Sequence, residues 1–316
     1  MSRIPVYLFT GFLGSGKTTV LLKVLEEMKK QGKKPAVILN ELGEVNVEKS
    51  LFGSQPVMEL LNGCICCTIQ DDLRTELSQF LSTQKEVDVI IIEGTGIANP
   101  KEVVESLTHP DLFDLVELYS IISLVDASKY LEYQSLFSSS KEIRTILKQQ
   151  ISHSSLLLLN KIDLIDEKTK IKVRKKVQDV IVDGTETIET TYGEVPIETI
   201  LKKRMESLVV SANASHHHHH HEHHHFRAVK IDDIPELDRI HFEKWLKSLP
   251  EHVIRAKGLV QFTESPRVFQ FQYSAGQLQL TKTTDDQQKE DPCLIIIGYQ
   301  LDIEEIQASF SQQFVR

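Results

Sequence analysis

Short apolar runs alternate with longer amphipathic stretches over the first two thirds of the chain. Six runs have the length of strands buried on both faces: Val6–Phe9, Ala36–Leu39, Val87–Ile92, Ile121–Val125, Leu156–Leu159 and Leu208–Val210. Apolar positions at helical spacing predict helices over three segments between them: Lys17–Lys30, Asp71–Leu81 and Lys168–Ile181. Strands that alternate with helices are typical of βαβ units. The pattern predicts an α/β fold, with a mostly parallel sheet and helices on both faces.

The pattern stops after Ser211. Residues 213–226 are polar and rich in histidine, so we expect a linker between two domains. The first domain is predicted over residues 1–212 and the second over residues 227–316.

The second domain is expected to be smaller and of α+β type. His241–Leu249 has the periodicity of a short helix. Val268–Tyr273 and Gln277–Thr281 alternate apolar and polar residues on either side of a Ser-Ala-Gly turn, which predicts a hairpin in an antiparallel sheet.

Length and charge exclude several classes of protein. A chain of 316 residues exceeds the usual size of one compact core, which agrees with two domains. With 36 Lys+Arg against 45 Asp+Glu, the net charge of −9 argues against binding to nucleic acid by bulk electrostatics. No apolar run approaches the roughly 20 residues that span a membrane, and the N-terminus has no signal-peptide pattern. Four cysteines, three of them within Cys64–Cys67, do not resemble a disulfide framework, so we expect a cytoplasmic protein.

The strongest motif is a phosphate-binding loop between the first predicted strand and helix. Residues Gly11–Thr18 satisfy G-x-x-x-x-G-K-[ST], in which backbone N–H groups and a helix N-terminus surround phosphate oxygens. Lys17 is expected to neutralise the β- and γ-phosphates, and the Thr18 hydroxyl to ligate Mg²⁺. The predicted phosphate-binding residues are Gly11, Gly14, Ser15, Gly16, Lys17, Thr18 and Thr19. The first domain is therefore predicted to be a P-loop NTPase-type domain that binds a nucleoside triphosphate.

Asn160-Lys161-Ile162-Asp163 follows the fifth apolar run and indicates the base. The Asp163 carboxylate can accept two hydrogen bonds from guanine, from N1–H and the 2-amino group, which adenine cannot offer. Asn160 is expected to brace the base and the loop, and the Lys161 stem to cover the ring. Ser211 and Ala212 are candidates to close the base pocket from the next strand end. The sequence favours GTP over ATP.

Glu93-Gly94-Thr95-Gly96 follows the third run, where P-loop enzymes carry a second acidic motif. A carboxylate here can hold Mg²⁺, usually through water, and the Gly96 N–H can contact the γ-phosphate. We expect catalysis to rest on Lys17, Thr18 and Glu93, although Glu93 is only one candidate for positioning the attacking water. The alternative is that Glu93 only caps its strand.

Cys64-Ile-Cys66-Cys67 predicts a metal site. Three thiols within four residues suit a thiophilic ion such as Zn²⁺, and residues at i and i+2 of an extended segment point the same way. The remaining ligands must come from elsewhere, with Glu41 and Glu44 as candidates. The alternatives are buried inert cysteines or a redox pair.

Nine histidines lie within ten positions of the linker, interrupted by Glu222. At neutral pH most imidazoles are uncharged and can ligate Zn²⁺, Ni²⁺, Co²⁺ or Cu²⁺. The predicted ligands are His216, His217, His218, His219, His220, His221, His223, His224 and His225. A purification tag is the alternative, but tags usually lie at a terminus.

Together, the G-F-L-G-S-G-K-T-T, N-E-L-G-E, N-G-C-I-C-C-T, E-G-T-G-I-A-N-P and N-K-I-D motifs resemble those of the CobW-type GTPases. These are P-loop proteins related to the GTPases that help load nickel into urease and hydrogenase. Phe242–Gly258 is similar to the start of the CobW C-terminal domain, so the resemblance covers nearly the whole chain. It implies slow GTP hydrolysis coupled to handling of a transition metal at the cysteine motif. Histidine-rich linkers in this family are associated mainly with zinc.

The sequence therefore predicts a GTP-hydrolysing metallochaperone that binds Zn²⁺ and transfers it to a client protein, with GTP controlling metal affinity. Delivery of cobalt or nickel, for example toward cobalamin synthesis, is an alternative. A passive zinc store based on the histidines and a P-loop kinase for a small molecule are others. The expected cofactors are GTP, Mg²⁺ and Zn²⁺, with Co²⁺ or Ni²⁺ in the alternative. The expected partner is the client, without nucleic acid or membrane, and a homodimer is possible.

Overall fold

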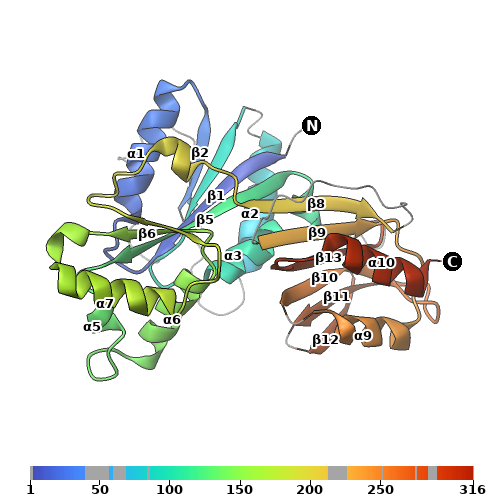
Figure 1. Cartoon of the computed structure of the whole chain (residues 1–316). Helices are drawn as coiled ribbons and strands as arrows, with labels where there is room; N and C mark the ends of the chain where they lie inside the picture. The colour runs from blue at the N-terminus through green and yellow to red at the C-terminus, as the bar shows by residue number, and fades with distance from the viewer. Residues whose placement is uncertain are drawn as a thin grey trace. The chain divides into compact units, whose positions relative to one another are not determined.

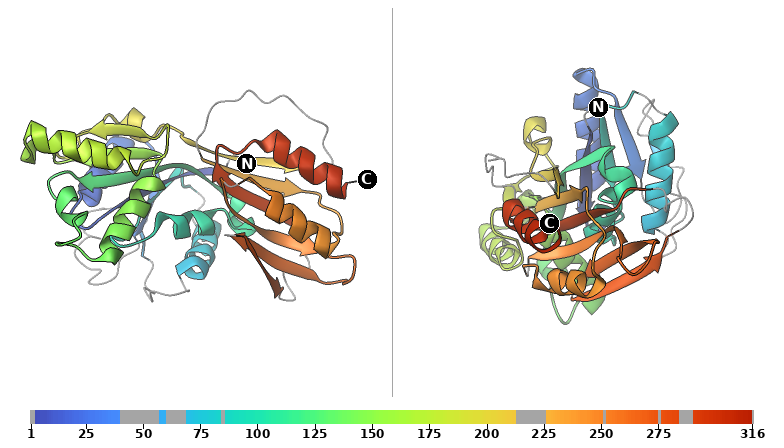
Figure 2. Two further views of the ribbon diagram at one scale, coloured as in Figure 1. Left: turned by 60° about the horizontal axis from the view of Figure 1, so that its bottom comes forward. Right: turned by 90° about the vertical axis from the view of Figure 1, so that its right-hand side faces the viewer.

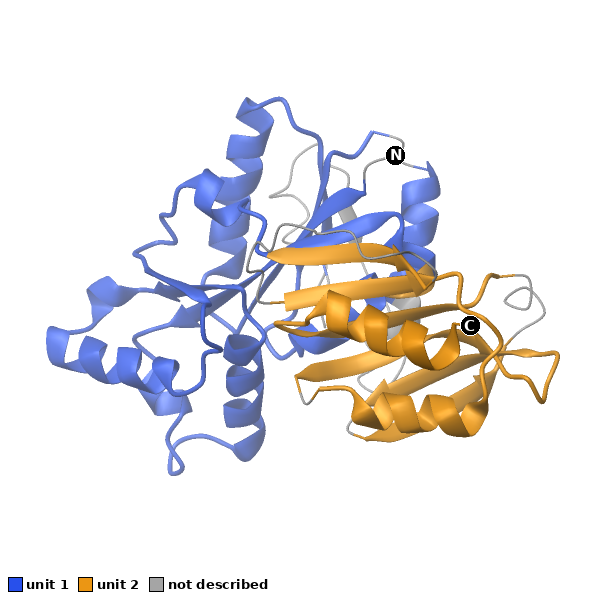
Figure 3. Ribbon diagram, turned by 45° about the vertical axis from the view of Figure 1, so that its right-hand side comes forward, with its two compact units in different colours: residues 1–107, 111–204 blue, residues 108–110, 205–316 orange. Residues whose placement is uncertain are grey.

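The computed structural model describes residues 3–39, 57–59, 69–83, 86–212, 226–250, 252–274, 276–283 and 290–315. The chain divides into two compact units, which Figure 3 shows in different colours. Unit 1 comprises Met1–Leu107 and Asp111–Arg204, and unit 2 comprises Thr108–Pro110 and Met205–Arg316.

Unit 1 is built on a seven-stranded sheet in the order β3-β2-β4-β1-β5-β6-β7 (Figure 1). All of its neighbouring strands run parallel. The strands are β1 (Ile4–Gly11), β2 (Pro35–Leu39), β3 (Val57–Glu59), β4 (Val89–Glu93), β5 (Val116–Asp126), β6 (Leu156–Asn160) and β7 (Glu186–Glu189). Because the strands are parallel, the loops that follow β1, β4 and β6 leave from the same edge of the sheet.

Helices cover both faces of this sheet (Figure 2). They are α1 (Lys17–Lys30), α2 (Ile69–Thr83), α3 (Pro100–Leu107), α4 (Pro110–Phe113), α5 (Tyr130–Tyr133), α6 (Lys141–Ser152), α7 (Glu167–Gln178) and α8 (Ile197–Ile200). Strand β6 shows why both faces need cover, since its alternate side chains enter two different cores. Leu156 and Leu158 lie in a cluster with α1, whereas Leu157 and Leu159 lie in a cluster with α6 and α7.

Unit 2 contains a six-stranded sheet in the order β12-β11-β10-β13-β9-β8. Its strands are β8 (Met205–Ser211), β9 (Phe226–Asp232), β10 (Val253–Gln261), β11 (Val268–Ser274), β12 (Gln277–Lys282) and β13 (Cys293–Tyr299). All neighbours are antiparallel except β8 and β9. Helices α9 (Arg239–Ser248) and α10 (Ile303–Phe314) pack on it through an aromatic core around Phe242, Trp245 and Phe310.

The predicted α/β fold with a smaller α+β domain is confirmed, and helix α1 has the predicted bounds. The placement of Leu208–Val210 in the first sheet is wrong, because β8 pairs with β9 in unit 2 and the compact units divide at Arg204. The last strand of the first sheet is instead β7, which the apolar pattern missed. Its sequence, Glu-Thr-Ile-Glu, contains no apolar run. An edge strand is only half-buried and does not need one.

Candidate nucleotide site

The phosphate-binding loop connects β1 to α1, and glycine is required at both of its ends. Gly11 has φ 138°, and a Cβ there would lie 2.3 Å from the Leu124 carbonyl oxygen of β5. Gly16 has φ 101°, and a Cβ there would lie 2.7 Å from the side-chain nitrogen of Asn160. Both positions exclude a side chain by space as well as by backbone conformation. The loop is thus held against β5 and β6.

Lys17 lies inside this loop. Its side chain is buried, with the residue 8% exposed, and its Nζ donates to the Gly11 carbonyl at 3.0 Å. A buried ammonium requires anionic or dipolar partners, and the N-terminus of α1 adds a field that favours negative charge. This arrangement suits a polyphosphate. Ser15 is buried beside Lys17, whereas Thr19 is exposed.

Thr18 and Glu93 come together from the start of α1 and the end of β4. The Thr18 hydroxyl donates to Glu93 Oε1 at 2.9 Å, and Glu93 is 4% exposed. A hydroxyl and a carboxylate form a hard-oxygen donor set, which is what Mg²⁺ prefers alongside phosphate oxygens and water. The two residues therefore fit the predicted magnesium site.

The segment after Glu93 turns back toward the phosphate loop. The Gly94 N–H extends the strand pairing by donating to the Phe9 carbonyl at 2.9 Å. Gly96 then lies so close to the loop that a Cβ on it would meet the Leu13 side chain at 2.5 Å and the Leu13 nitrogen at 2.8 Å. Gly96 is therefore adjacent to the phosphate loop, where the sequence predicts a γ-phosphate contact.

Asn160 joins the phosphate loop to a segment that the sequence did not single out. Its Nδ2 donates to the Ser15 carbonyl at 2.9 Å, and its Oδ1 accepts from the Gly193 N–H at 3.0 Å. The segment of Gly193 follows β7, and Lys23 of α1 holds it further by donating to the Tyr192 carbonyl at 2.8 Å. The signal that could have revealed it is Gly193 itself, in a Thr-Thr-Tyr-Gly turn after a polar edge strand.

Lys161 and Asp163 follow Asn160 at the same edge. Lys161 has a left-handed backbone conformation, φ 61°, and its Nζ lies 2.6 Å from Asp126 Oδ2 at the end of β5. This ion pair, which the sequence did not predict, fixes the direction of the Lys161 stem. Asp163 lies in the 3₁₀ turn Ile162–Leu164 and is exposed, so its carboxylate is open to a ligand.

Ser211 and Ala212 do not follow a strand of the first sheet. Both residues belong to unit 2, where Ser211 ends β8 and Ala212 packs in the core with α9 and α10. The segment that reaches the Asn160 motif is Thr190–Gly193, because β7 rather than β8 is the neighbour of β6. The expected position of Ser211 and Ala212, at the next strand end of the first sheet, is thus wrong.

The predicted metal ligands lie outside the described residues: Cys64, Cys66, Cys67, Glu41, Glu44 and the histidines of His216–His225. Within the described ranges, no group of three or more His, Cys, Asp or Glu side chains is placed to hold a metal ion. No helix in this part of the chain is long and apolar enough to cross a membrane.

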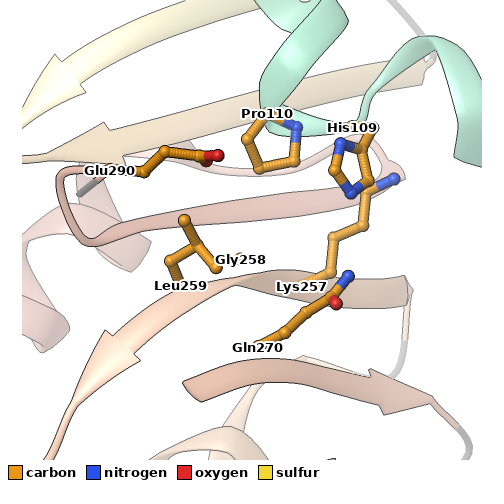
Figure 4. Close-up of a pocket in the computed structure, with 7 residues that line it drawn as sticks. All are labelled: His109, Pro110, Lys257, Gly258, Leu259, Gln270 and Glu290. Carbon is orange, nitrogen blue, oxygen red and sulfur yellow. The ribbon is translucent and has the colours of Figure 1, made fainter. Parts of the chain in front are cut away.

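Two hollows are lined by none of the predicted phosphate-binding residues. One, of about 330 Å³, lies between α1 and residues 193–200 and is lined by Val20, Lys23, Val24 and Ile197 among others. The other is in unit 2, lined by His109, Pro110, Lys257, Gly258, Leu259, Gln270 and Glu290 (Figure 4). Its volume of about 10 Å³ has room for one water molecule, which excludes a nucleotide there.

Comparison with known proteins agrees with this geometry. The CobW/HypB/UreG nucleotide-binding domain matches residues 5–189, and the cobalamin synthesis protein cobW C-terminal domain matches residues 226–313. The zinc chaperone YjiA of Escherichia coli strain K12 is 30% identical over 331 positions, which cover 98% of this chain and 99% of YjiA. The zinc chaperone CobW of Pseudomonas aeruginosa is 26% identical over 298 positions, which cover 84% of this chain and 79% of CobW.

The fold also has a solved counterpart. The crystal structure of Zn(II)-bound YjiA GTPase from E. coli superposes with a TM-score of 0.50 at 23% identity, covering 99% of both chains. Both domain matches occur in the expected order, and the nucleotide-binding match contains the phosphate loop, Glu93 and the Asn160 motif. The chain therefore belongs to the CobW/HypB/UreG family of P-loop GTPases, and to its CobW type, which carries the additional C-terminal domain.

Proposed function

We propose that this GTPase is a metallochaperone that binds Zn²⁺ at Cys64, Cys66 and Cys67 and transfers it to a client protein, with the nucleotide state setting the zinc affinity. Relatives named zinc chaperones and a Zn(II)-bound relative of the same fold support zinc as the cargo. Three clustered thiols match the preference of this ion.

One observation carries the coupling between the two ligands. Leu39, the last residue of β2, lies in register with both Glu93 and Glu59 of the neighbouring strands. Glu41 follows Leu39 in the sequence and the cysteines follow Glu59, and both of these strand ends lie in register with Glu93, which contacts Thr18. Cys64 follows Glu59 by five residues, which span at most about 18 Å when extended.

The hydrolytic site uses the residues already described. Lys17 is proposed to bind the β- and γ-phosphates, the Gly96 N–H the γ-phosphate, and Thr18 with Glu93 to hold Mg²⁺. Bound there, Mg²⁺ supplies positive charge to the phosphate oxygens. Hydrolysis consumes water: its oxygen bonds to the γ-phosphorus, the bond to the bridging oxygen breaks, and GDP leaves with that electron pair. Asp163 selects guanine.

Coupling between GTP binding and Zn²⁺ binding must be reciprocal. If GTP raises the affinity for Zn²⁺, Zn²⁺ must raise the affinity for GTP by the same factor. A coupling of about 3 kcal/mol corresponds to roughly 150-fold, which is sufficient to turn a protein that holds zinc into one that donates it. Zinc binding must also weaken below about pH 6, because the ligands are thiolates that compete with protons.

The test is a titration of Zn²⁺ against a chelating dye, with Mg²⁺ and either a non-hydrolysable GTP analogue or GDP. We expect tighter binding with the analogue, and we expect Cys66→Ala to abolish the difference while nucleotide binding persists. Cys293→Ala is the matched control, since this cysteine is buried in the core of unit 2. Equal affinities in the two nucleotide states would refute the coupling. The same titration with Co²⁺ and Ni²⁺ decides among the metals.

A further inference from the structure

A buried glutamine on α6 contacts the segment that follows Glu93. Gln150 is 1% exposed and lies on the inward face of the helix, beside Leu147 and Ile151. An apolar residue is the usual occupant of such a position, because a buried amide must recover the hydrogen bonds that it loses with water. The amide nitrogen of Gln150 recovers its hydrogen bonds, whereas the buried Oε1 accepts none within the described residues.

Gln150 donates both of its hydrogen bonds to a single segment. Nε2 lies 3.1 Å from the Gly96 carbonyl oxygen and 3.3 Å from the Ala98 carbonyl oxygen. Two acceptors determine which end of the amide faces them, since the opposite orientation would bring oxygen against oxygen. Within the described residues, Gln150 is the side chain that binds these two carbonyl groups together.

The phosphate loop bounds the same segment on another side. The Gly94 N–H is paired with the Phe9 carbonyl of β1, and a Cβ on Gly96 would lie 2.5 Å from the Leu13 side chain. The segment is thus confined between β1, the phosphate loop and α6. Its first residue follows Glu93, which contacts Thr18. A shift of Gly96 away from α6 is opposed by the two hydrogen bonds from Gln150.

We propose that Gln150 is a positioning residue for GTP hydrolysis. By holding the Gly96 and Ala98 carbonyls, it restricts the backbone of the segment after Glu93 and so keeps the Gly96 N–H directed at the γ-phosphate. This inference rests on the proposed contact between Gly96 and the γ-phosphate. It predicts a role that depends on the third phosphate, because GDP lacks the group that Gly96 is expected to contact.

Gln150→Met tests the proposal, since methionine retains the length of the side chain but cannot donate. The kcat for GTP should fall on the order of tenfold to a hundredfold, because a displaced contact weakens transition-state binding. The affinity for a non-hydrolysable GTP analogue should fall, while the affinity for GDP stays within about twofold. Gln149→Met is the matched control, as this neighbouring side chain makes no hydrogen bond in the described part of the chain.

Gln150→Glu provides a signature that a purely structural role would not produce. Its carboxylate presents only acceptors to the two carbonyls, but the protonated acid can donate to one of them. The ratio of its kcat to that of the wild type should therefore rise as the pH is lowered. This variant also serves if Gln150→Met fails to fold.

The outcomes separate this inference from the proposed function. Wild-type protein that binds the GTP analogue and GDP equally in the presence of Mg²⁺ would refute the γ-phosphate contact and with it the positioning role, while the zinc titration decides the proposed function separately. If the wild type binds the GTP analogue and GDP with different affinities and Gln150→Met keeps the same difference, the positioning role alone is refuted. An equal loss of GDP and analogue affinity would also refute it, because the loss would then not depend on the γ-phosphate.

Discussion

The side-chain oxygen of Asn160 accepts a hydrogen bond of 3.0 Å from the backbone N–H of Gly193. The other end of the same amide donates to Ser15 in the phosphate loop. Three segments that are distant in sequence, namely the phosphate loop, the end of β6 and the turn after β7, are thereby tied through one buried side chain. A change in the turn after β7 should therefore alter nucleotide binding.

Gly193→Ala should weaken GTP and GDP binding alike and destabilise the protein. Gly193 has φ 64°, and a Cβ would lie 2.2 Å from Val20 Cγ2. The backbone conformation costs about 1–2 kcal/mol and the clash a further ~1–3 kcal/mol. Gly32→Ala is the control, because Gly32 has φ 72° but nothing lies within 4 Å of its Cβ position. Denaturant unfolding measures the loss of stability, and nucleotide titration measures the loss of affinity. Equal losses in Gly193→Ala and Gly32→Ala would show that the clash with Val20 contributes nothing.

Asp163→Asn should transfer preference from GTP toward xanthosine triphosphate. The exposed carboxylate is expected to accept from guanine N1–H and the 2-amino group, and an asparagine can donate to the 2-carbonyl of xanthine. Wild-type protein should bind GTP on the order of a hundredfold more tightly than ATP. Competition titrations with the three nucleotides measure this. Equal competition by ATP in the wild type would show that Asp163 does not read the base.

Thr18→Ala should weaken Mg²⁺-dependent binding of GTP more than Mg²⁺-independent binding of GDP. The Thr18 hydroxyl and Glu93 form the oxygen pair that fits the metal, and loss of such a group typically costs about 10–100-fold in metal affinity. Thr18→Ser, which keeps the hydroxyl, should restore most of this affinity. Titration of Mg²⁺ at a fixed GTP concentration distinguishes the variants. Identical Mg²⁺ titration curves for the wild type and Thr18→Ala would show that Thr18 is not part of the metal site.

His153 should make the protein less stable in mild acid. Burial lowers the pKa of His153, against the opposing effect of its hydrogen bond to the Gln149 carbonyl. The unfolded chain therefore takes up a proton first, so stability is present above the unfolded pKa of about 6.5 and is lost as the pH falls below it. Between pH 5 and 7, the free energy of unfolding should depend less on pH in His153→Asn than in the wild type. The same substitution at the exposed His241 is the control, and parallel curves for wild type and His153→Asn would contradict the prediction.

The sequence alone determined those features whose chemistry is contiguous along the chain. The phosphate loop, helix α1 and the Asn160 motif are each specified by neighbouring residues, because glycine conformation, helical periodicity and strand-end position are local properties. The hairpin of β11 and β12 belongs to the same group, since alternation and a turn residue define it locally. The CobW-type resemblance followed from the order of such motifs, and the comparisons confirm it.

Only the tertiary structure decided which distant segments meet. The order of strands put β8 into the other sheet and made β7 the neighbour of β6, so the Gly193 N–H after β7 donates to Asn160. Asp126 was paired with Lys161, and Gln150 with the segment after Glu93, although each partner lies at least 35 residues away in sequence. No periodic pattern in the sequence predicts these pairs. A single buried polar contact is selected by the packing of the whole sheet and its helices, not by the residues on either side of it.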